Sequence, residues 1–290
     1  MLATLSARRS YHGATGFALA ATGDYRRKFG EGGQSGFVKF FNPEPTNFNW
    51  SSNNDSSAEA ALVALEDQIL AEGPDTIAAI LIESIVGGGG VLIPPPGYME
   101  GIRSLCDKYS ILMICDEVMV GFGRTGQFFA FQHFEGLVPD IVTSGKGLTG
   151  SILPLSMVGV RQKIKDYFED HALGWGATFH AHPVALACAY ETVKYLLKED
   201  IVNKVRRLEP IMKEEMEDLV SKHASVKRAR CVGLIGCLDL QTPSGQAVQQ
   251  LGDPLPPAVQ YLHEAMLDNG LLALFRPPLL HCAPPLTICE

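Results

Sequence analysis

The chain has 290 residues, of which 46% are hydrophobic and 19% are charged, the balance of an ordinary globular protein rather than a disordered or fibrous one. Its net charge of −8 is spread thinly, and no basic stripe is interleaved with aromatic residues, which argues against nucleic-acid or anionic-membrane partners and favours small molecules. The longest apolar stretch, residues 77–93, contains Glu83, Ser84 and four glycines, so it is too polar for a membrane span of about 18 uncharged residues.

The seven cysteines are scattered, form no CxxC pair and follow no secretory signal. This pattern predicts reduced thiols in an intracellular protein, either cytoplasmic or mitochondrial, and the cysteines are more often core residues than catalysts. Residues 1–13 contain the arginines and serine typical of a transit peptide. They continue directly into a motif that we expect inside the fold, so we do not favour a presequence.

Short β-branched runs alternate with helical patterns in the first part of the chain. Four runs predict buried strands, at residues 77–83, 111–116, 140–144 and 155–160. Two segments with apolar residues at helical spacing predict helices, at residues 57–71 and 96–109. This alternation predicts an α/β fold with a largely parallel sheet.

After Pro183 the pattern changes. We expect helices at 184–197, 201–223 and 256–269, a strand at 231–240 and two short apolar runs near the end. These elements predict a second, smaller α+β domain, and the predicted boundaries are 1–185 and 186–290. Residues 30–36 and 42–55 are rich in Gly, Pro, Asn and Ser, which predicts loops.

The strongest local pattern is the apolar strand that ends in Asp116 and is followed by a glycine-rich turn. In open α/β sheets, ligands bind outside the carboxyl ends of the strands, so Asp116 is well placed to face a cofactor. A carboxylate there could hold a proton on a heteroaromatic nitrogen. The alternative, a helix N-cap or ordinary loop aspartate, stays about equally open on this evidence.

Lys146 follows the next predicted strand and lies between two glycines. An amine in that position can approach a planar ligand from the side, and partial burial lowers its pKa toward the neutral, nucleophilic form. Taken alone, a solvated loop lysine is the favoured interpretation. A phosphate-binding P-loop is excluded, because Asp140 stands where that motif needs a glycine.

Five segments together resemble the class III, or omega-type, aminotransferases that depend on pyridoxal phosphate. They are SYHG at 10–13, LIESIVGGGGV at 81–91, DEV and GFGRTG within 116–126, PDIVTSGKGLTG at 139–150 and GATFHAHP at 176–183. The resemblance runs from Arg9 to Pro285. It implies fold type I, with a mostly parallel large domain, and an aminotransferase that moves an amino group from an amine or omega-amino acid to an oxo acid.

The resemblance also implies the role of each site residue. Lys146 would hold the cofactor as a Schiff base and shuttle the substrate proton, and Asp116 would pair with the pyridine nitrogen. Val118 would pack under the ring and Tyr11 would stack on its other face, with His12 and Gly13 completing that motif. Thr178 would reach the cofactor phosphate of the neighbouring subunit, which implies a homodimer.

The sequence departs from the family at both ends. Only about ten residues precede Tyr11, where the family has a long segment with a glycine-serine phosphate loop, and the family's closing helix has no counterpart after residue 290. On this view the chain is truncated at both ends. Loss of the phosphate loop would weaken cofactor binding by several kcal/mol. We therefore expect a weak dimer or an aggregation-prone monomer.

Other departures concern the substrate. Gly88 replaces the glutamate of ornithine and 4-aminobutyrate members, which disfavours those substrates and favours amines, β-alanine or taurine with pyruvate or another oxo acid. Met119 replaces a common glutamine. Arg276 is the candidate for binding a substrate carboxylate, although a surface arginine is equally open. Glu83 could simply hold a neighbouring loop.

Two other functional interpretations stay open on the sequence. The chain could be a catalytically impaired fragment that acts as a partner of a full-length relative, or another fold-type-I enzyme such as an aminomutase or a racemase. We assign no metal, because His180 and His182 lack a third ligand.

Overall fold

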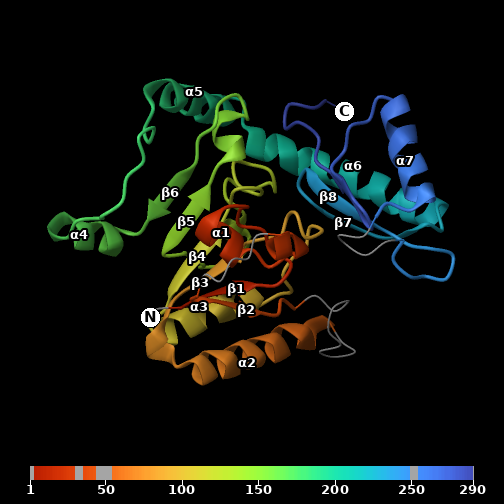
Figure 1. The fold of residues 1–290 in the computed structure, drawn as a ribbon. Coiled ribbons are helices and arrows are strands. Elements are labelled where there is room, and N and C mark those ends of the chain that lie inside the picture. Colours follow the sequence, from red (N-terminus) through yellow and green to blue (C-terminus); the bar gives the residue numbers. More distant parts are fainter. Residues whose placement is uncertain (1–2, 30–34, 44–53, 249–253, 290) are drawn as a thin grey trace.

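The computed structural model describes residues 3–29, 35–43, 54–248 and 254–289, which form two sheets joined by long helices (Figure 1). The first sheet has the order β2-β1-β3-β4-β5-β6, and the second has the order β7-β8-β10-β9. The strands of the first sheet are β1 (Ala3–Ala7), β2 (Phe37–Phe40), β3 (Ile77–Glu83), β4 (Leu112–Asp116), β5 (Ile141–Ser144) and β6 (Met157–Val160). Strands β1 to β5 are parallel to their neighbours, and β6 runs antiparallel to β5.

Two helices cover one face of the first sheet, α2 (Asn54–Glu72) and α3 (Tyr98–Lys108) (Figure 1). The residues of α3 that face the sheet recur at helical spacing: Tyr98, Met99, Ile102, Leu105 and Cys106 are all buried. They pack with residues of α2, β1, β3 and β4 in the largest hydrophobic cluster of the described chain. Since each fully buried large apolar side chain contributes about 1.5–3 kcal/mol, this cluster fixes the strands that carry the site.

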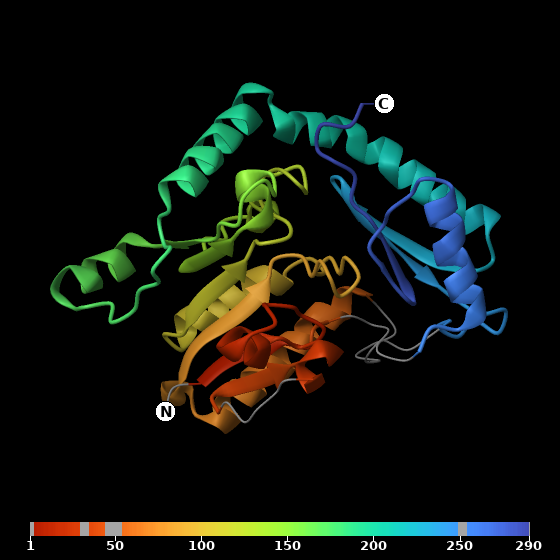
Figure 2. The same ribbon diagram turned by 45° about the horizontal axis from the view of Figure 1, so that its top comes forward.

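The second sheet is antiparallel and packs against a long helix, α6 (Ile201–Lys222). Figure 2 shows α5 (Pro183–Lys198) and α6 bridging the two sheets. The remaining elements of this region are β7 (Val226–Val232), β8 (Ile235–Leu240), α7 (Pro257–Asp268), β9 (Phe275–Arg276) and β10 (Leu279–Cys282). The predicted domain limit at residue 185 falls within α5, and that boundary stays a prediction.

Most expected elements are confirmed, with three corrections. The single strand expected at 231–240 is wrong, because Gly233 turns the chain there at φ 55° and separates β7 from β8. The strands expected at 140–144 and 155–160 are present as β5 and β6, but β5 is mostly half-buried and β6 is a half-exposed edge strand, rather than buried strands. Residues 54 and 55, expected in a loop, begin α2, while the rest of that loop from 44 on, and residues 30–34, lie outside the described residues.

Several elements escaped prediction from the sequence. They are β1, β2, α1 (Gly16–Ala21), α4 (Gln162–Asp170) and the short 3-10 turns η1 (Tyr25–Phe29), η2 (Pro74–Thr76), η3 (Ala130–His133) and η4 (Lys146–Thr149). Strand β1 contains a serine whose hydroxyl is buried and donates to Ala21 O at 2.7 Å. This serine interrupts the apolar pattern of β1, which is why the strand was not predicted. The strand lies between β2 and β3 in the first sheet, so residues 3–7 belong to the fold.

Candidate active site

Four loops meet at the carboxyl edge of the first sheet. In the parallel register Glu83 lies opposite Asp116, and Asp116 lies opposite Thr143, three residues before Lys146. The segment that contains Tyr11 follows β1, the other neighbour of β3. The topology thus brings together residues more than a hundred positions apart at the edge where α/β proteins bind ligands.

Asp116 is held by two hydrogen bonds. Its Oδ2 lies 2.7 Å from His12 Nδ1, and its Oδ1 accepts the Val118 N–H at 3.0 Å. The His12 Nε2 atom is buried and has no hydrogen-bond partner in the described part of the chain. The carboxylate is therefore oriented by its surroundings, unlike a loop aspartate that points into solvent.

Lys146 stands exposed at the start of η4, with its backbone in the left-handed region at φ 42°. This conformation costs a non-glycine residue about 1–2 kcal/mol and is often found at functional positions. The surrounding protein lowers the pKa of Lys146 by desolvation, although the charges of Asp116 and Glu83 oppose that shift. Among the described residues its amine makes no hydrogen bond or ion pair, so it is available to react.

Glu83 is buried at the end of β3 and accepts two backbone hydrogen bonds, from Tyr11 N–H at 2.8 Å and Gly87 N–H at 2.9 Å. These contacts confirm that it holds the neighbouring loop, and they also tie that loop to the Tyr11 segment. Burial raises the pKa of Glu83 to about 7, with a further increase from Asp116.

Two arginines stand beside this cluster. The guanidinium of Arg26 lies 3.6 Å above the centre of the Tyr11 ring, and Arg276 of β9 comes from the second sheet. A Cβ atom on Gly88 would lie 3.5 Å from Arg276 Nη1. The Gly88 backbone thus approaches Arg276, and with no side chain at position 88 no carboxylate meets this guanidinium there.

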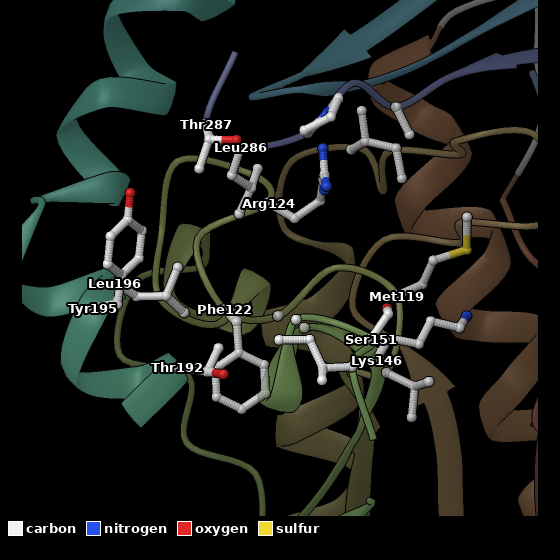
Figure 3. A pocket seen from close by; sticks show the side chains of 18 of the residues that line it. Met119, Phe122, Arg124, Lys146, Ser151, Thr192, Tyr195, Leu196, Leu286 and Thr287 are labelled. Carbon is white, nitrogen blue, oxygen red and sulfur yellow. The ribbon is translucent and has the colours of Figure 1, made fainter. Parts of the chain in front are cut away.

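A cavity of about 830 Å³ opens beside Lys146 (Figure 3). Met119 and Lys146 lie on one side of it, and Tyr195 and Leu196 of α5 on the other. Val118 lines the same cavity, whereas Tyr11, His12 and Asp116 do not. The cavity is mostly apolar with one amine on its wall, as small-molecule sites commonly are.

The structure separates Thr178 from this cluster. Thr178 lies on an exposed turn between α4 and α5, in the segment that runs outside the body of the chain (Figure 1). Gly13 follows His12 at φ 139°, and a Cβ there would lie 2.7 Å from Ala18 Cβ, so only glycine fits without displacement.

No group of three His, Cys, Asp or Glu side chains among the described residues is arranged to hold a metal ion, and no helix of that part is long and apolar enough to cross a membrane.

Two residues of the DEV and GFGRTG segments have positions that sequence reasoning missed. Glu117 is buried and accepts N–H groups from Ala130 and Phe131, so it fixes the loop after the site. Arg124 donates to Leu234 O at 2.8 Å and Pro284 O at 2.6 Å, which joins the glycine-rich turn to the second sheet region. The sequence offered one signal for these roles: Glu117 and Arg124 are charged residues in a segment that otherwise consists mainly of apolar residues and glycines.

Comparison with known proteins gives a consistent result. The model of the family described as aminotransferase class III matches residues 3–290. A taurine–pyruvate aminotransferase of Bilophila wadsworthia is 33% identical over 239 residues, which are 80% of this chain and 52% of that protein. A putrescine–pyruvate aminotransferase of Pseudomonas aeruginosa is 39% identical over 178 residues, 61% of this chain and 39% of that protein.

Solved structures agree closely with this fold. The taurine:2-oxoglutarate aminotransferase of Bifidobacterium kashiwanohense, in complex with PLP and glutamate, has a TM-score of 0.91 and 41% identity, covering 99% of this chain and 65% of that one. An (S)-enantioselective omega-transaminase of Thermomicrobium roseum has a TM-score of 0.90 and 33% identity, with 99% and 64% coverage. The chain thus spans about half the length of the curated relatives and about two thirds of the solved chains.

These neighbours establish fold type I and a family cofactor, pyridoxal phosphate, and they do not favour the interpretations as a partner fragment, an aminomutase or a racemase. The geometry fits that cofactor, because an oriented carboxylate lies at one strand end and an amine with no partner in the described part of the chain lies at the next. The family match covers nearly the whole chain, and the solved neighbours share its fold. The chain belongs to the class III aminotransferases.

Proposed function

We propose that the chain is a transaminase that moves an amino group from an amine or omega-amino acid, taurine or β-alanine among them, to pyruvate or another oxo acid. The observation that carries this proposal is the placement of Asp116 and Lys146 at the carboxyl ends of β4 and β5, with Tyr11 and His12 beside them. The names of the relatives support the substrate class.

Each residue has a role that follows from its surroundings. When bound, the cofactor supplies an aldehyde that exchanges amines and a ring that withdraws electrons. Asp116 would hold a proton on the ring nitrogen, and His12 keeps that carboxylate in place. Lys146 moves a proton to and from the substrate carbon, for which its lowered pKa suits it.

The remaining residues position the reactants. Tyr11 and Val118 would pack against the cofactor ring, and Gly13 allows the close turn that brings His12 to Asp116. Arg276 binds a substrate carboxylate with its guanidinium, since it has no hydrogen bond or ion pair among the described residues.

Assembly and location complete the proposal. Thr178 would bind the phosphate of a cofactor held by a second copy, which would make the working unit a homodimer; its exposed position away from Lys146 supports that role. We place the protein inside the cell, in the cytoplasm or the mitochondrion, because all seven cysteines are free thiols. Fractionation of the source cells checks the location, and recovery only in the extracellular fraction would contradict it.

The test is the substitution Lys146→Ala. Purified chain with added pyridoxal phosphate should show a visible absorbance band that depends on Lys146, and transfer of amino groups to pyruvate should stop in the variant. The matched control is Lys213→Ala, an exposed lysine of α6 that lies outside the site. An equal band in Lys146→Ala, or no band in the wild-type chain, would show that the assignment is wrong.

A further inference from the structure

A second guanidinium stands beside Arg276. A Cβ atom on Gly88 would lie 3.5 Å from Arg276 Nη1 and 3.9 Å from Arg26 Nη2, so both arginines converge on one point. They reach it from opposite parts of the fold, because Arg26 belongs to η1 after β1 and Arg276 belongs to β9 of the second sheet. Glycine at position 88 leaves this point without a side chain.

Arg26 is held rigidly in this place. Asp24 accepts hydrogen bonds from the Arg26 backbone N–H at 2.8 Å, from its Nε at 2.7 Å and also from its Nη2. The ring of Tyr11 covers one face of the guanidinium. These contacts occupy the Nε–Nη2 edge and one face, so the second N–H of Nη2, the atom nearest Gly88, and both N–H groups of Nη1 have no partner among the described residues.

A small cavity of about 110 Å³ adjoins Arg276 and lies next to Asp24, the carboxylate that binds Arg26. It is lined by Arg9, Arg276, Gly88, Gly89 and Asp24, among others, and has room for an anionic group of a few heavy atoms but not for a whole substrate. The one carboxylate in it, Asp24, already binds Arg26. The local charge is therefore positive. Desolvation by burial is the main cause that lowers the pKa of Arg276, and the charge of Arg26 lowers it further.

We propose that Arg26 is a specificity-determining residue that binds, together with Arg276, a sulfonate group on the amino donor. A carboxylate has two oxygens in one plane, which one guanidinium fork satisfies. A sulfonate has three oxygens that point in three dimensions, and two guanidinium groups arriving from different elements provide donors in that arrangement. The inference rests on the proposed function, because it concerns the donor of that same reaction.

The test measures the binding of unreactive anions by isothermal titration to the full chain, so that it does not depend on turnover. The probes are ethanesulfonate and propionate, with 1-propanol as the uncharged control. We expect Arg26→Gln to weaken ethanesulfonate binding at least tenfold and propionate binding less than threefold. Arg276→Gln should weaken both anions, Arg26→Lys should restore part of the sulfonate binding, and Arg207→Gln, at an exposed position of α6, should change neither.

A second readout separates selectivity from a structural effect through Tyr11. In the cofactor-loaded chain, Arg26→Gln should lower kcat/KM for taurine at least tenfold relative to kcat/KM for an amine that has no acidic group. The Lys146-dependent absorbance should stay unchanged. An equal loss for both anions, undisturbed sulfonate binding, or no sulfonate binding by the wild-type chain would overturn the proposal. If sulfonate binding follows these expectations but no Lys146-dependent absorbance forms, the transaminase function fails and the anion site stands.

Discussion

The pairing of His12 with Asp116 can be tested by changing the shape and the donors of one side chain. In His12→Phe the 2.7 Å contact to Asp116 Oδ2 is lost and the carboxylate loses its orientation. We expect the dissociation constant of pyridoxal phosphate to rise about tenfold, which corresponds to about 1.4 kcal/mol. In His12→Asn the amide can occupy the position of Nδ1, so most of the affinity should return. Equal affinity in His12→Phe and the wild-type chain, measured by absorbance titration, would remove His12 from the site.

Glu83 makes the stability of the chain depend on pH. Burial raises its folded-state pKa from 4.5 to about 7, so the folded chain holds the proton more tightly than the unfolded chain does. The stabilisation of the folded chain by protonated Glu83 is fully present below about pH 4.5 and is lost as the pH rises through about 7. The free energy of unfolding should fall by about 3 kcal/mol in total. Urea unfolding of the cofactor-free chain at pH 5 and pH 8 measures this loss.

The control for Glu83 is its neutral analogue. The variant Glu83→Gln lacks the titration, so its unfolding free energy should decrease less than that of the wild-type chain between the two pH values. Glu214→Gln, an exposed position of α6, should behave as the wild-type chain does. Parallel curves for the wild-type chain and Glu83→Gln would mean that Glu83 is ionised at both pH values.

At the scale of elements, the glycine-rich turn at 121–126 is joined to the second sheet by Arg124. Its guanidinium donates to Leu234 O and Pro284 O, and Leu234 N–H donates back to Arg124 O at 3.0 Å. In Arg124→Ala both carbonyls lose a charged donor, so we expect the unfolding free energy to fall by about 3 kcal/mol. Arg207→Ala should change it by less than about 0.5 kcal/mol. Chemical denaturation compares the two variants, and equal stabilities would show that the turn is held by other contacts.

The same elements show what could be predicted from the sequence. Strands β3 and β4 are apolar runs that end in an acid, and β5 begins with two β-branched apolar residues, so these strands and the placement of Asp116 beside Lys146 follow from the pattern. Strand β1 could not be found, because its buried serine is satisfied by Ala21 O, a contact that only the folded chain provides. Arg26 was missed for the same reason: it meets Arg276 of β9 near Gly88 only in the folded chain, and the two arginines are 250 residues apart along the chain.

At the scale of the whole molecule, α5 exposes most of its apolar side chains. Only Ala185 and Ala189 are buried in this helix, while Tyr190 and Leu197 are both more than 60% exposed. The neighbouring segment that contains Thr178 is exposed throughout. A contiguous apolar surface of this kind favours association, and a second copy of the chain is the partner that the proposed role of Thr178 requires.

If Thr178 of one copy binds the cofactor phosphate of the other, dimerisation and cofactor binding must strengthen each other by mass action. A cofactor at about 100 times its dissociation constant then stabilises the dimer by about 2.7 kcal/mol per site, so the dimer dissociation constant should fall at least tenfold when pyridoxal phosphate is added. In Thr178→Val the hydroxyl is lost while the shape is kept, and the dimer should no longer respond to the cofactor; Thr242→Val, on the turn after β8, should respond as the wild-type chain does. Sedimentation with and without cofactor measures each constant. A wild-type dimer of equal affinity in both conditions would show that the phosphate is bound within one chain, and Thr178 would then have no part in the site.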